Sequence, residues 1–267
     1  MIVDARTIPD GTEIETDVCI VGAGAAGIAL ATELTRRNVS VALLETGGID
    51  YESEAQDLCE AEEEGVKADL DFARLRQFGG STGHWGGNCA PFAPHELAHR
   101  PWIPNSGWPI SAEELQPYYD RAADYCELAS NVYDAEAWAR ADTEFDGAKL
   151  PFEPDSLVHK ILLRSSPPTR FGETHRAALE APGASAKVFL HAHVLEIETD
   201  ESGVRVTGLR TTDLGGRNHR FRAKTVILAA GVENARLMLL SNRARPNGLG
   251  NDHDNVGRYF MGHLTVY

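Results

Sequence analysis

Residues 17–27 read Asp-Val-Cys-Ile-Val-Gly-Ala-Gly-Ala-Ala-Gly, a short apolar run that leads into three glycines spaced as Gly-x-Gly-x-x-Gly. The run 17–21 is typical of a strand that is buried on both faces. Residues 25–37 are mostly small and favour a helix, with Asn38 as a left-handed stop, and residues 39–44 form a second apolar run. This order predicts a strand–helix–strand unit.

The glycine turn has the spacing that binds a dinucleotide. Five residues form it: Gly22, Gly24, Ala25, Ala26 and Gly27. The first glycine permits a tight turn, the second lets a pyrophosphate approach the backbone, and the third lets the helix pack closely on the strand. The start of the helix offers free N–H groups and a positive dipole end. Glu45 ends the second strand, where an acidic side chain accepts hydrogen bonds from an adenosine ribose.

The motif itself does not choose between FAD and NAD, but the second half of the chain favours FAD. An NAD enzyme of this kind usually continues with further strand–helix units. Here apolar and polar residues alternate in four segments, which predicts an antiparallel meander: 188–190, 194–199, 204–212 and 219–223. A third apolar strand, residues 225–231, follows and ends at Gly231.

The composition excludes several classes of function. The chain has 25 Lys and Arg against 40 Asp and Glu, a net charge of −15, which repels nucleic acid and anionic membrane surfaces. No apolar run is long enough to cross a bilayer. The four cysteines include no Cys-x-x-Cys pair, so neither a disulfide framework nor a metal site is predicted. Residues 1–16 lack a signal-peptide pattern; we therefore expect a cytoplasmic protein, with export alongside a partner as the alternative.

The chain resembles the glucose-methanol-choline (GMC) family of FAD oxidoreductases along most of its length. The segments that carry the likeness are VCIVGAGAAGIALATEL with LLETGG, LRQFGGSTGHWGGN, SGWPISAEELQPYYDRA, and VILAAGVENARLMLLSN with NVGRYFMGH. The run with Gly-Gly-Ser-Thr is the most specific of them. Together with His-Trp, it is most similar to the branch that contains pyranose oxidase and the sugar and polyol dehydrogenases.

The resemblance implies a set of cofactor contacts. Family members thread a Gly-Gly-Ser/Thr segment past the flavin ring, which here corresponds to Gly80, Ser81 and Thr82. A backbone contact to the adenine falls near Val194, and Gly231 approaches FAD from the other side. Asn88 either touches flavin or substrate, or serves the backbone conformation of its Gly-Gly-Asn turn.

His84 and Trp85 have two interpretations. In pyranose oxidase the histidine of a Ser-Thr-His-Trp segment is bonded to the flavin. In this chain Gly83 separates Thr82 from His84, so the covalent bond is one alternative and a hydrogen-bonding or packing histidine is the other. Trp85 is expected to pack in the core or on the flavin.

The fold expected from these segments is a three-layer, Rossmann-like α/β FAD-binding domain made of two stretches, residues 1–92 and 187–267. Residues 93–186 are expected to be an inserted, incomplete substrate or cap region, with Ser111 and Glu114 as a capping box at the start of a helix. The chain ends within a predicted strand, residues 264–267.

The reaction implied by the resemblance is oxidation of a CH–OH group in a sugar, polyol or other alcohol, with hydride transfer to flavin N5. A histidine base lies in a C-terminal segment of the family, which is expected beyond Tyr267, so the catalytic residues are unknown and the isolated chain is expected to be inactive. His191 and His193 alternate as metal ligands can, but a surface strand is the favoured interpretation.

Two alternative functions share these residues. One is a non-catalytic FAD-binding fragment of a split or truncated enzyme, and the other, which the Gly-Gly-Ser-Thr segment disfavours, is an NAD-dependent dehydrogenase. The expected partners are a small alcohol or sugar and either an electron-acceptor subunit or a missing C-terminal half.

Overall fold

The computed structural model describes residues 1–62, 64, 70–134, 137, 138, 140 and 161–261. The predicted strand 264–267 lies outside these residues. The chain divides into two compact units. Unit 1 comprises Met1–His84 and Arg170–Tyr267, and unit 2 comprises Trp85–Thr169.

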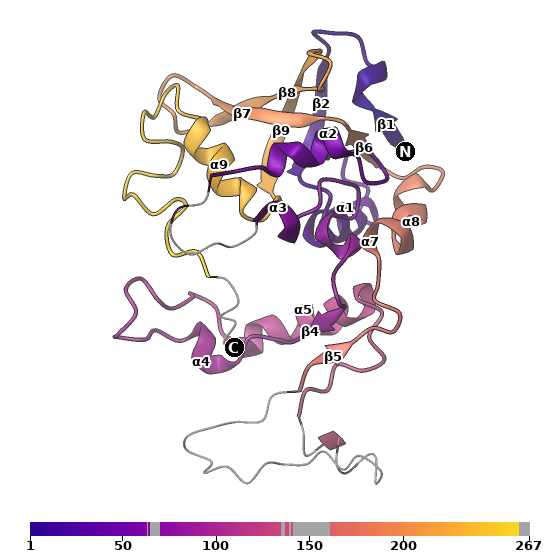
Figure 1. Cartoon of the computed structure of the whole chain (residues 1–267), viewed down its shortest axis with the longest axis vertical. Coiled ribbons are helices and arrows are strands. Elements are labelled where there is room, and N and C mark those ends of the chain that lie inside the picture. The colour runs from indigo at the N-terminus through magenta and orange to yellow at the C-terminus, as the bar shows by residue number, and fades with distance from the viewer. Residues whose placement is uncertain (63, 65–69, 135–136, 139, 141–160, 262–267) are drawn as a thin grey trace. The chain divides into compact units, whose positions relative to one another are not determined.

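Unit 1 is built on a seven-stranded sheet in the order β1-β6-β3-β2-β9-β8-β7 (Figure 1). Its strands are β1 (Ile2–Asp4), β2 (Glu13–Val21), β3 (Val41–Leu44), β6 (Ala186–Leu190), β7 (His193–Thr199), β8 (Val206–Thr212) and β9 (Asn218–Leu228). The first five strands of the order are parallel, and β8 and β7 extend the sheet through antiparallel pairs. The α/β fold with a Rossmann-like unit is therefore confirmed.

Helix α1 (Ala25–Thr35) covers one face of the parallel strands. Ile20 and Leu43 are completely buried, as is Ile28 of the helix, and Leu43 approaches the helix at Gly27. The alternate strand residues, such as Cys19 and Leu44, belong to a core on the other face, which also contains Leu237 of helix α9 (Glu233–Leu240). Apolar residues at successive positions are thus buried on both faces, as the unbroken apolar runs predict.

The remaining helices in the described part of unit 1 are short. They are η1 (Ala5–Thr7), α2 (Ser53–Gln56), η2 (Asp57–Cys59), α3 (Leu70–Ala73), η3 (Gly80–Gly83), α7 (Phe171–Thr174) and α8 (Arg176–Glu180). Helix α9 lies beside β7, so the meander and this helix form one wall of the unit (Figure 1).

The well-described elements of unit 2 are a two-stranded antiparallel ribbon and the helices α4 (Pro94–Leu97) and α5 (Ala112–Tyr125). The ribbon pairs β4 (Asn88–Cys89) with β5 (Leu163–Arg164). The expected capping box of α5 is present: Glu114 N–H donates to Ser111 Oγ at 3.2 Å, and Ser111 N–H donates to Glu114 Oε2 at 2.7 Å.

The structure differs from the expected arrangement in several strands. Residues 188–190, expected in the antiparallel meander, belong to β6, which pairs in parallel with β1 and β3. Residues 219–223 and 225–231 were expected as separate strands, whereas β9 runs without interruption from Asn218 to Leu228. It pairs with β2 from Arg220 to Leu228, because β2 begins at Glu13 and not at Asp17. Strand β1 was not predicted, since three residues at an edge carry too little pattern to indicate a strand.

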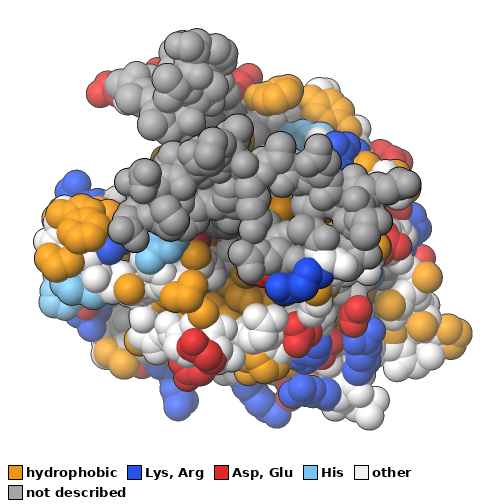
Figure 2. All heavy atoms as spheres, turned by 90° about the horizontal axis from the view of Figure 1, so that it is seen from below, with side chains coloured by type: hydrophobic (Ala, Val, Ile, Leu, Met, Phe, Trp, Pro, Cys, Tyr) orange, Lys and Arg blue, Asp and Glu red, His pale blue; other side chains and the backbone are white. Residues whose placement is uncertain are grey.

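The boundaries of the inserted unit also differ from those expected. Residues 93–186 were expected, whereas unit 2 comprises Trp85–Thr169. Unit 2 ends at Thr169 because α7 and α8 pack within unit 1, α7 against η3 and α1, and α8 against α1 and β6. No helix among the described residues is long and apolar enough to cross a membrane. Among the described residues on the face shown in Figure 2, basic side chains lie among acidic ones.

Candidate functional site

The three glycines of the turn between β2 and α1 have different surroundings: Gly22 and Gly27 leave no space for a side chain, whereas Gly24 does. Gly22 has φ 98°, and a Cβ there would lie 2.9 Å from Ala230 Cα. A Cβ on Gly27 would lie 1.9 Å from Gly22 O, so this glycine allows α1 to approach the turn. A Cβ on Gly24 would meet nothing within 4 Å. The turn therefore leaves space at Gly24, in front of the first N–H groups of α1, which have no partner within the helix.

A cavity of about 540 Å³ opens in front of this turn, within unit 1. Its volume lies in the range typical of ligand sites, about 300–1,000 Å³. Nine of the predicted site residues line it: Gly22, Gly24, Ala25, Glu45, Gly80, Ser81, Thr82, Val194 and Gly231. The cavity thus gathers the ends of β2, β3 and β9 with the Gly-Gly-Ser-Thr segment.

Glu45 is 7% exposed at the end of β3, and its carboxylate organises the adjoining backbone. Its oxygens accept N–H donors from Ala23 and Thr46, both at 2.9 Å, and from Gly47 at 3.2 Å. Burial raises the pKa of Glu45, and these donors together with Arg76 oppose that shift. The carboxylate thus links the glycine turn, through Ala23, to the residues that follow β3.

The Gly-Gly-Ser-Thr segment is fixed against the same turn. Gly79, with φ 100°, donates its N–H to Ala23 O at 2.8 Å, and a Cβ on Gly80 would lie 3.0 Å from Gly24 Cα. Thr82 Oγ1 donates to Gly79 O at 2.6 Å and accepts from Phe171 N–H at 3.2 Å. The backbone of Gly80–Gly83 is therefore held against the cavity by hydrogen bonds on both sides.

Five predicted site residues do not line the cavity. Ala26 is exposed on α1, and Gly27 lies on the buried face of the same helix, against Gly22 O. His84 is exposed, and its ring stacks on Phe72 with the ring centroids 5.9 Å apart. Trp85 and Asn88 belong to unit 2, where Trp85 Nε1 donates to Thr169 O at 2.7 Å and Asn88 pairs with Arg164 in the β4–β5 ribbon.

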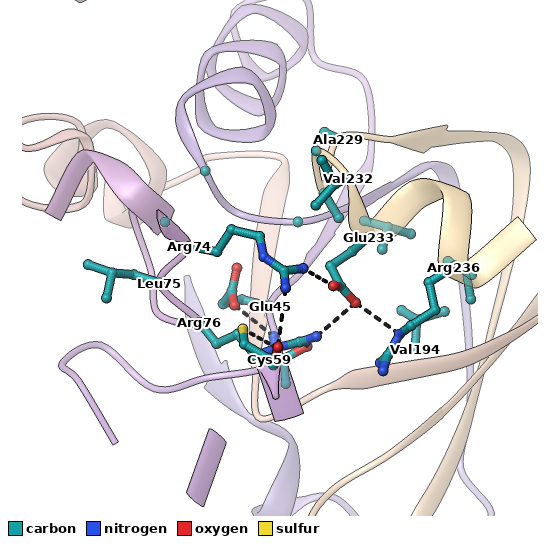
Figure 3. Close-up of a pocket in the computed structure, with 18 of the residues that line it drawn as sticks. Glu45, Cys59, Arg74, Leu75, Arg76, Val194, Ala229, Val232, Glu233 and Arg236 are labelled. Atoms are coloured by element: carbon teal, nitrogen blue, oxygen red, sulfur yellow. Dashed lines mark hydrogen bonds and ion pairs between the residues drawn. The ribbon is translucent and has the colours of Figure 1, made fainter. Parts of the chain in front are cut away.

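A group of arginines on the cavity wall was not predicted from the sequence. Glu233, at the start of α9, pairs with Arg74, with Arg76 at 2.8 Å and with Arg236 at 3.1 Å (Figure 3). Arg76 Nε also donates to Cys59 Sγ at 3.1 Å. The alternating Arg74 and Arg76 just before Gly79 were the only sign of this group in the sequence. Their partner, Glu233, lies more than 150 residues away.

The charges of this group fix the protonation of its neighbours. Burial alone would raise the pKa of Glu233, but Arg76, Arg236 and Arg74 outweigh it, so that the pKa is lowered. His193 faces the same wall, and burial followed by the charges of Arg76 and Arg236 lowers its pKa to about 4. Its ring is therefore neutral at neutral pH, with Nδ1 3.3 Å from Thr46 Oγ1.

The expected surface strand at His191 and His193 is wrong. His191 is 6% exposed, with φ 54° in the turn between β6 and β7, and His193 begins β7 at the cavity. The reason is that the turn folds inward against Glu45 and Gly47, whose carbonyls accept its N–H groups. Within the described part of the chain, no three His, Cys, Asp or Glu side chains form a potential metal site.

Comparison with known proteins supports a dinucleotide-binding fold. The family model of an NAD(P)-binding Rossmann-like domain matches residues 20–49, which contain the glycine turn and Glu45. The fructose dehydrogenase large subunit of Gluconobacter japonicus is 24% identical over an alignment that covers 95% of this chain and 59% of that protein. The 2-methyl-1,2-propanediol dehydrogenase of Mycolicibacterium austroafricanum is 25% identical, with coverages of 94% and 55%.

Solved structures share the fold at lower identity. The pyridoxine 4-oxidase from Mesorbium loti superposes with a TM-score of 0.56 at 17% identity, covering 84% of this chain and 51% of that chain. A formate oxidase from Aspergillus oryzae superposes with a TM-score of 0.53 at 17% identity, covering 88% of this chain and 48% of that chain. The chain thus spans somewhat more than half the length of the curated relatives it matches.

Proposed function

Because the homologues of this chain are FAD-dependent oxidoreductases of the glucose-methanol-choline family, we propose that its cavity binds FAD and that the whole protein oxidises a CH–OH group of an alcohol or sugar. The observation that carries the proposal is the convergence of three features on one cavity. These are the open position at Gly24, the buried carboxylate of Glu45 and the backbone of Gly80–Gly83.

Each feature fits one part of the cofactor. The free N–H groups at the start of α1 suit the pyrophosphate, and the missing side chain of Gly24 leaves room for it. Glu45 suits the ribose hydroxyls, which would take up remaining acceptor capacity of a carboxylate that already holds the turn. Val194, at the start of β7, is proposed to contact the adenine through its backbone, and Gly80, Ser81 and Thr82 to border the flavin.

The arginine group supplies charge complementarity. Arg74, Arg76 and Arg236 contribute three positive charges to the wall, against the negative charges of Glu233 and Glu45. The summed side-chain charge is therefore +1 when both carboxylates are ionised and His193 is neutral, and it opposes the two negative charges of a pyrophosphate. This balance favours an anionic dinucleotide over a neutral ligand of the same size.

We propose that His84 does not form a covalent bond to the flavin. Its stacking on Phe72 and its exposed position outside the cavity wall support a packing role. The one-residue insertion of Gly83 between Thr82 and His84 supports the same conclusion. FAD is then held by non-covalent contacts alone.

Bound FAD supplies the chemistry of accepting a hydride from the carbon that bears the hydroxyl group. This chain's own residues are proposed to bind, orient and enclose the cofactor. We assign no catalytic base among the described histidines. His193 lies beside Thr46 at the Glu45 side of the cavity, and its pKa of about 4 makes it a weak base, while His84 is exposed. The fructose dehydrogenase relative is named a large subunit; by analogy, an electron-accepting partner of this protein is a further proposal.

The test is an absorbance spectrum of the purified chain, as isolated and after titration with FAD, followed by acid precipitation. We expect flavin bands that saturate with added FAD and pass into the acid supernatant. Flavin retained in the pellet would overturn the non-covalent assignment. A colourless chain that takes up NAD in preference to FAD would overturn the proposed cofactor.

A further inference from the structure

A buried histidine outside the cavity joins three segments that are distant in the sequence. The His191 side chain is 7% exposed in the turn between β6 and β7. Its Nδ1 lies 3.1 Å from Asp4 Oδ1 at the end of β1, and its Nε2 lies 2.9 Å from Glu52 Oε2 just before α2. Both ring nitrogens therefore face carboxylates.

This geometry matches the hydrogen-bonding capacity of a doubly protonated ring. An ionised carboxylate only accepts hydrogen bonds, so two such partners are satisfied together only when both ring nitrogens carry protons. The Asp4 and Glu52 side chains are 33% and 39% exposed, but the ring nitrogens that face them are buried, so a neutral ring would point one lone pair at a carboxylate oxygen. The contacts of His191 are thus those of an imidazolium ion.

The other charges near this group are few. Arg6 on η1 binds Asp4 with two nitrogens, at 2.7 and 3.0 Å, and lies close enough to Glu52 and Asp213 for their charges to act on it. The pKa of Asp4 is lowered, first by its hydrogen bond to Arg6 and in smaller part by His191. Gly48 also packs beside the ring, since a Cβ there would lie 3.2 Å from His191 Nε2.

The backbone of the same turn holds the ribose side of the cavity. His191 N–H donates to Gly47 O at 3.2 Å, and Ala192 N–H donates to Glu45 O at 2.8 Å. Gly47 N–H in turn donates to the Glu45 carboxylate. His191 itself adopts φ 54°, a strained conformation for a residue with a side chain, although histidine enters it more readily than most. The ring contacts stabilise this conformation and thereby the position of the turn.

We propose that His191, held as an imidazolium between Asp4 and Glu52, is a positioning residue for Glu45 and makes the cofactor affinity of the cavity fall when the ring loses its proton. The inference rests on the proposed binding of FAD. Loss of the proton breaks one of the two carboxylate contacts, the turn relaxes from its left-handed conformation, and the carbonyl contacts to Glu45 and Gly47 weaken. No contact between His191 and the cofactor is required.

The decisive experiment compares the FAD dissociation constant of the purified wild-type chain and of His191→Asn between about pH 5.5 and about pH 8.5, the range in which histidine titrates. Asparagine tolerates the left-handed backbone but carries no titratable charge. We expect the wild-type dissociation constant to rise about tenfold across the range, and that of His191→Asn to be high and without this rise. Titration of Glu45 would act in the opposite direction and is common to both proteins.

Two further variants separate the role from simple packing. Glu52→Gln keeps the size and an acceptor oxygen but removes one charge, so it is expected to reduce the pH dependence. His219→Gln is the matched control, because His219 is equally buried in unit 1 and faces the carbonyl of Ile8, 3.3 Å from Nε2, in place of a carboxylate. It is expected to keep the wild-type pH dependence.

The outcomes are distinguishable. FAD binding by the wild type with the same pH dependence in His191→Asn would overturn this inference and leave the proposed function intact. An absence of FAD binding at every pH would overturn both. Ring ¹⁵N chemical shifts of His191, measured without FAD at about pH 6, are expected to be those of an imidazolium, and shifts of a neutral ring would overturn the inference independently of the cofactor.

Discussion

Gly24 and Gly27 are three residues apart in the same motif, but the space available for a side chain differs between them. A side chain at Gly27 has no space, because the helix backbone already lies against Gly22 O. A side chain at Gly24 meets no protein atom within 4 Å and would project into the space that the proposed pyrophosphate needs. The two substitutions to alanine therefore separate the requirement of the fold from that of the ligand.

We predict that Gly24→Ala leaves the thermal stability of the chain unchanged and weakens FAD binding at least tenfold. Gly27→Ala, by contrast, forces α1 away from β2 and is expected to lower the free energy of unfolding by about 3 kcal/mol or more. Unfolding followed by circular dichroism measures the stability of both variants, and quenching of flavin fluorescence measures their affinity for FAD. A Gly24→Ala chain that binds FAD like the wild type would remove the pyrophosphate from this position.

Glu45→Gln is expected to weaken FAD binding about 10- to 100-fold, which corresponds to about 1.4–2.7 kcal/mol. Each carboxylate oxygen of Glu45 accepts a backbone N–H group, from Ala23 and from Thr46. The glutamine amide has no negative charge, and its NH2 group would face one of these N–H donors. Isothermal titration with FAD measures the effect. Glu54→Gln, an exposed position on α2, serves as the control and is expected to bind FAD with wild-type affinity.

At the scale of elements, the first turn of α9 is joined to the segment before Gly79 through Glu233. Arg74 and Arg76 are 18% and 10% exposed, so Glu233→Gln leaves two largely buried guanidiniums without their carboxylate. We expect a loss of about 2 kcal/mol in the free energy of unfolding at neutral pH. Glu180→Gln, which removes an exposed ion pair with Arg176, is expected to cost less than about 0.5 kcal/mol.

The stability difference between the wild type and Glu233→Gln is expected to depend on pH. The pKa of Glu233 is lowered in the folded chain from its ordinary 4.5, so the carboxylate contributes stability above about pH 4.5 and loses that contribution as the pH falls through the folded value. The stability difference between wild type and Glu233→Gln should therefore shrink as the pH is lowered below 4.5. Chemical unfolding at a series of pH values measures it, and a constant difference would contradict the role of the three arginines.

The sequence predicts local elements better than their pairing. The strand–turn–helix around Gly22 and the capped start of α5 at Ser111 depend on neighbours a few residues away, and both were found. The junction of the meander with β9 and the edge strand β1 depend on pairing with residues far along the chain, as does the partnership of Arg76 with Glu233. Such contacts leave no periodic pattern in the sequence, because each partner by itself is typical of many surfaces.

At the scale of the whole molecule, the division into two units assigns spectroscopic probes to each. The four tryptophans, Trp85, Trp102, Trp108 and Trp138, all belong to unit 2. The cavity and the completely buried Cys19 of β2 belong to unit 1. Burial raises the pKa of the Cys19 thiol to about 12, so its alkylation at neutral pH reports unfolding of the sheet.

FAD should therefore stabilise the two units unequally. A ligand at a hundred times its dissociation constant stabilises the state that binds it by about 2.7 kcal/mol. We predict that FAD at this concentration moves the alkylation of Cys19 in a urea titration to higher denaturant and leaves the tryptophan fluorescence transition where it was. Peptide mapping after pulsed alkylation identifies the labelled cysteine, and Gly24→Ala serves as the control in which FAD moves neither transition. An equal shift of both probes in the wild type would mean that the two units unfold as one, and a shift of the tryptophan transition alone would place the FAD site in unit 2.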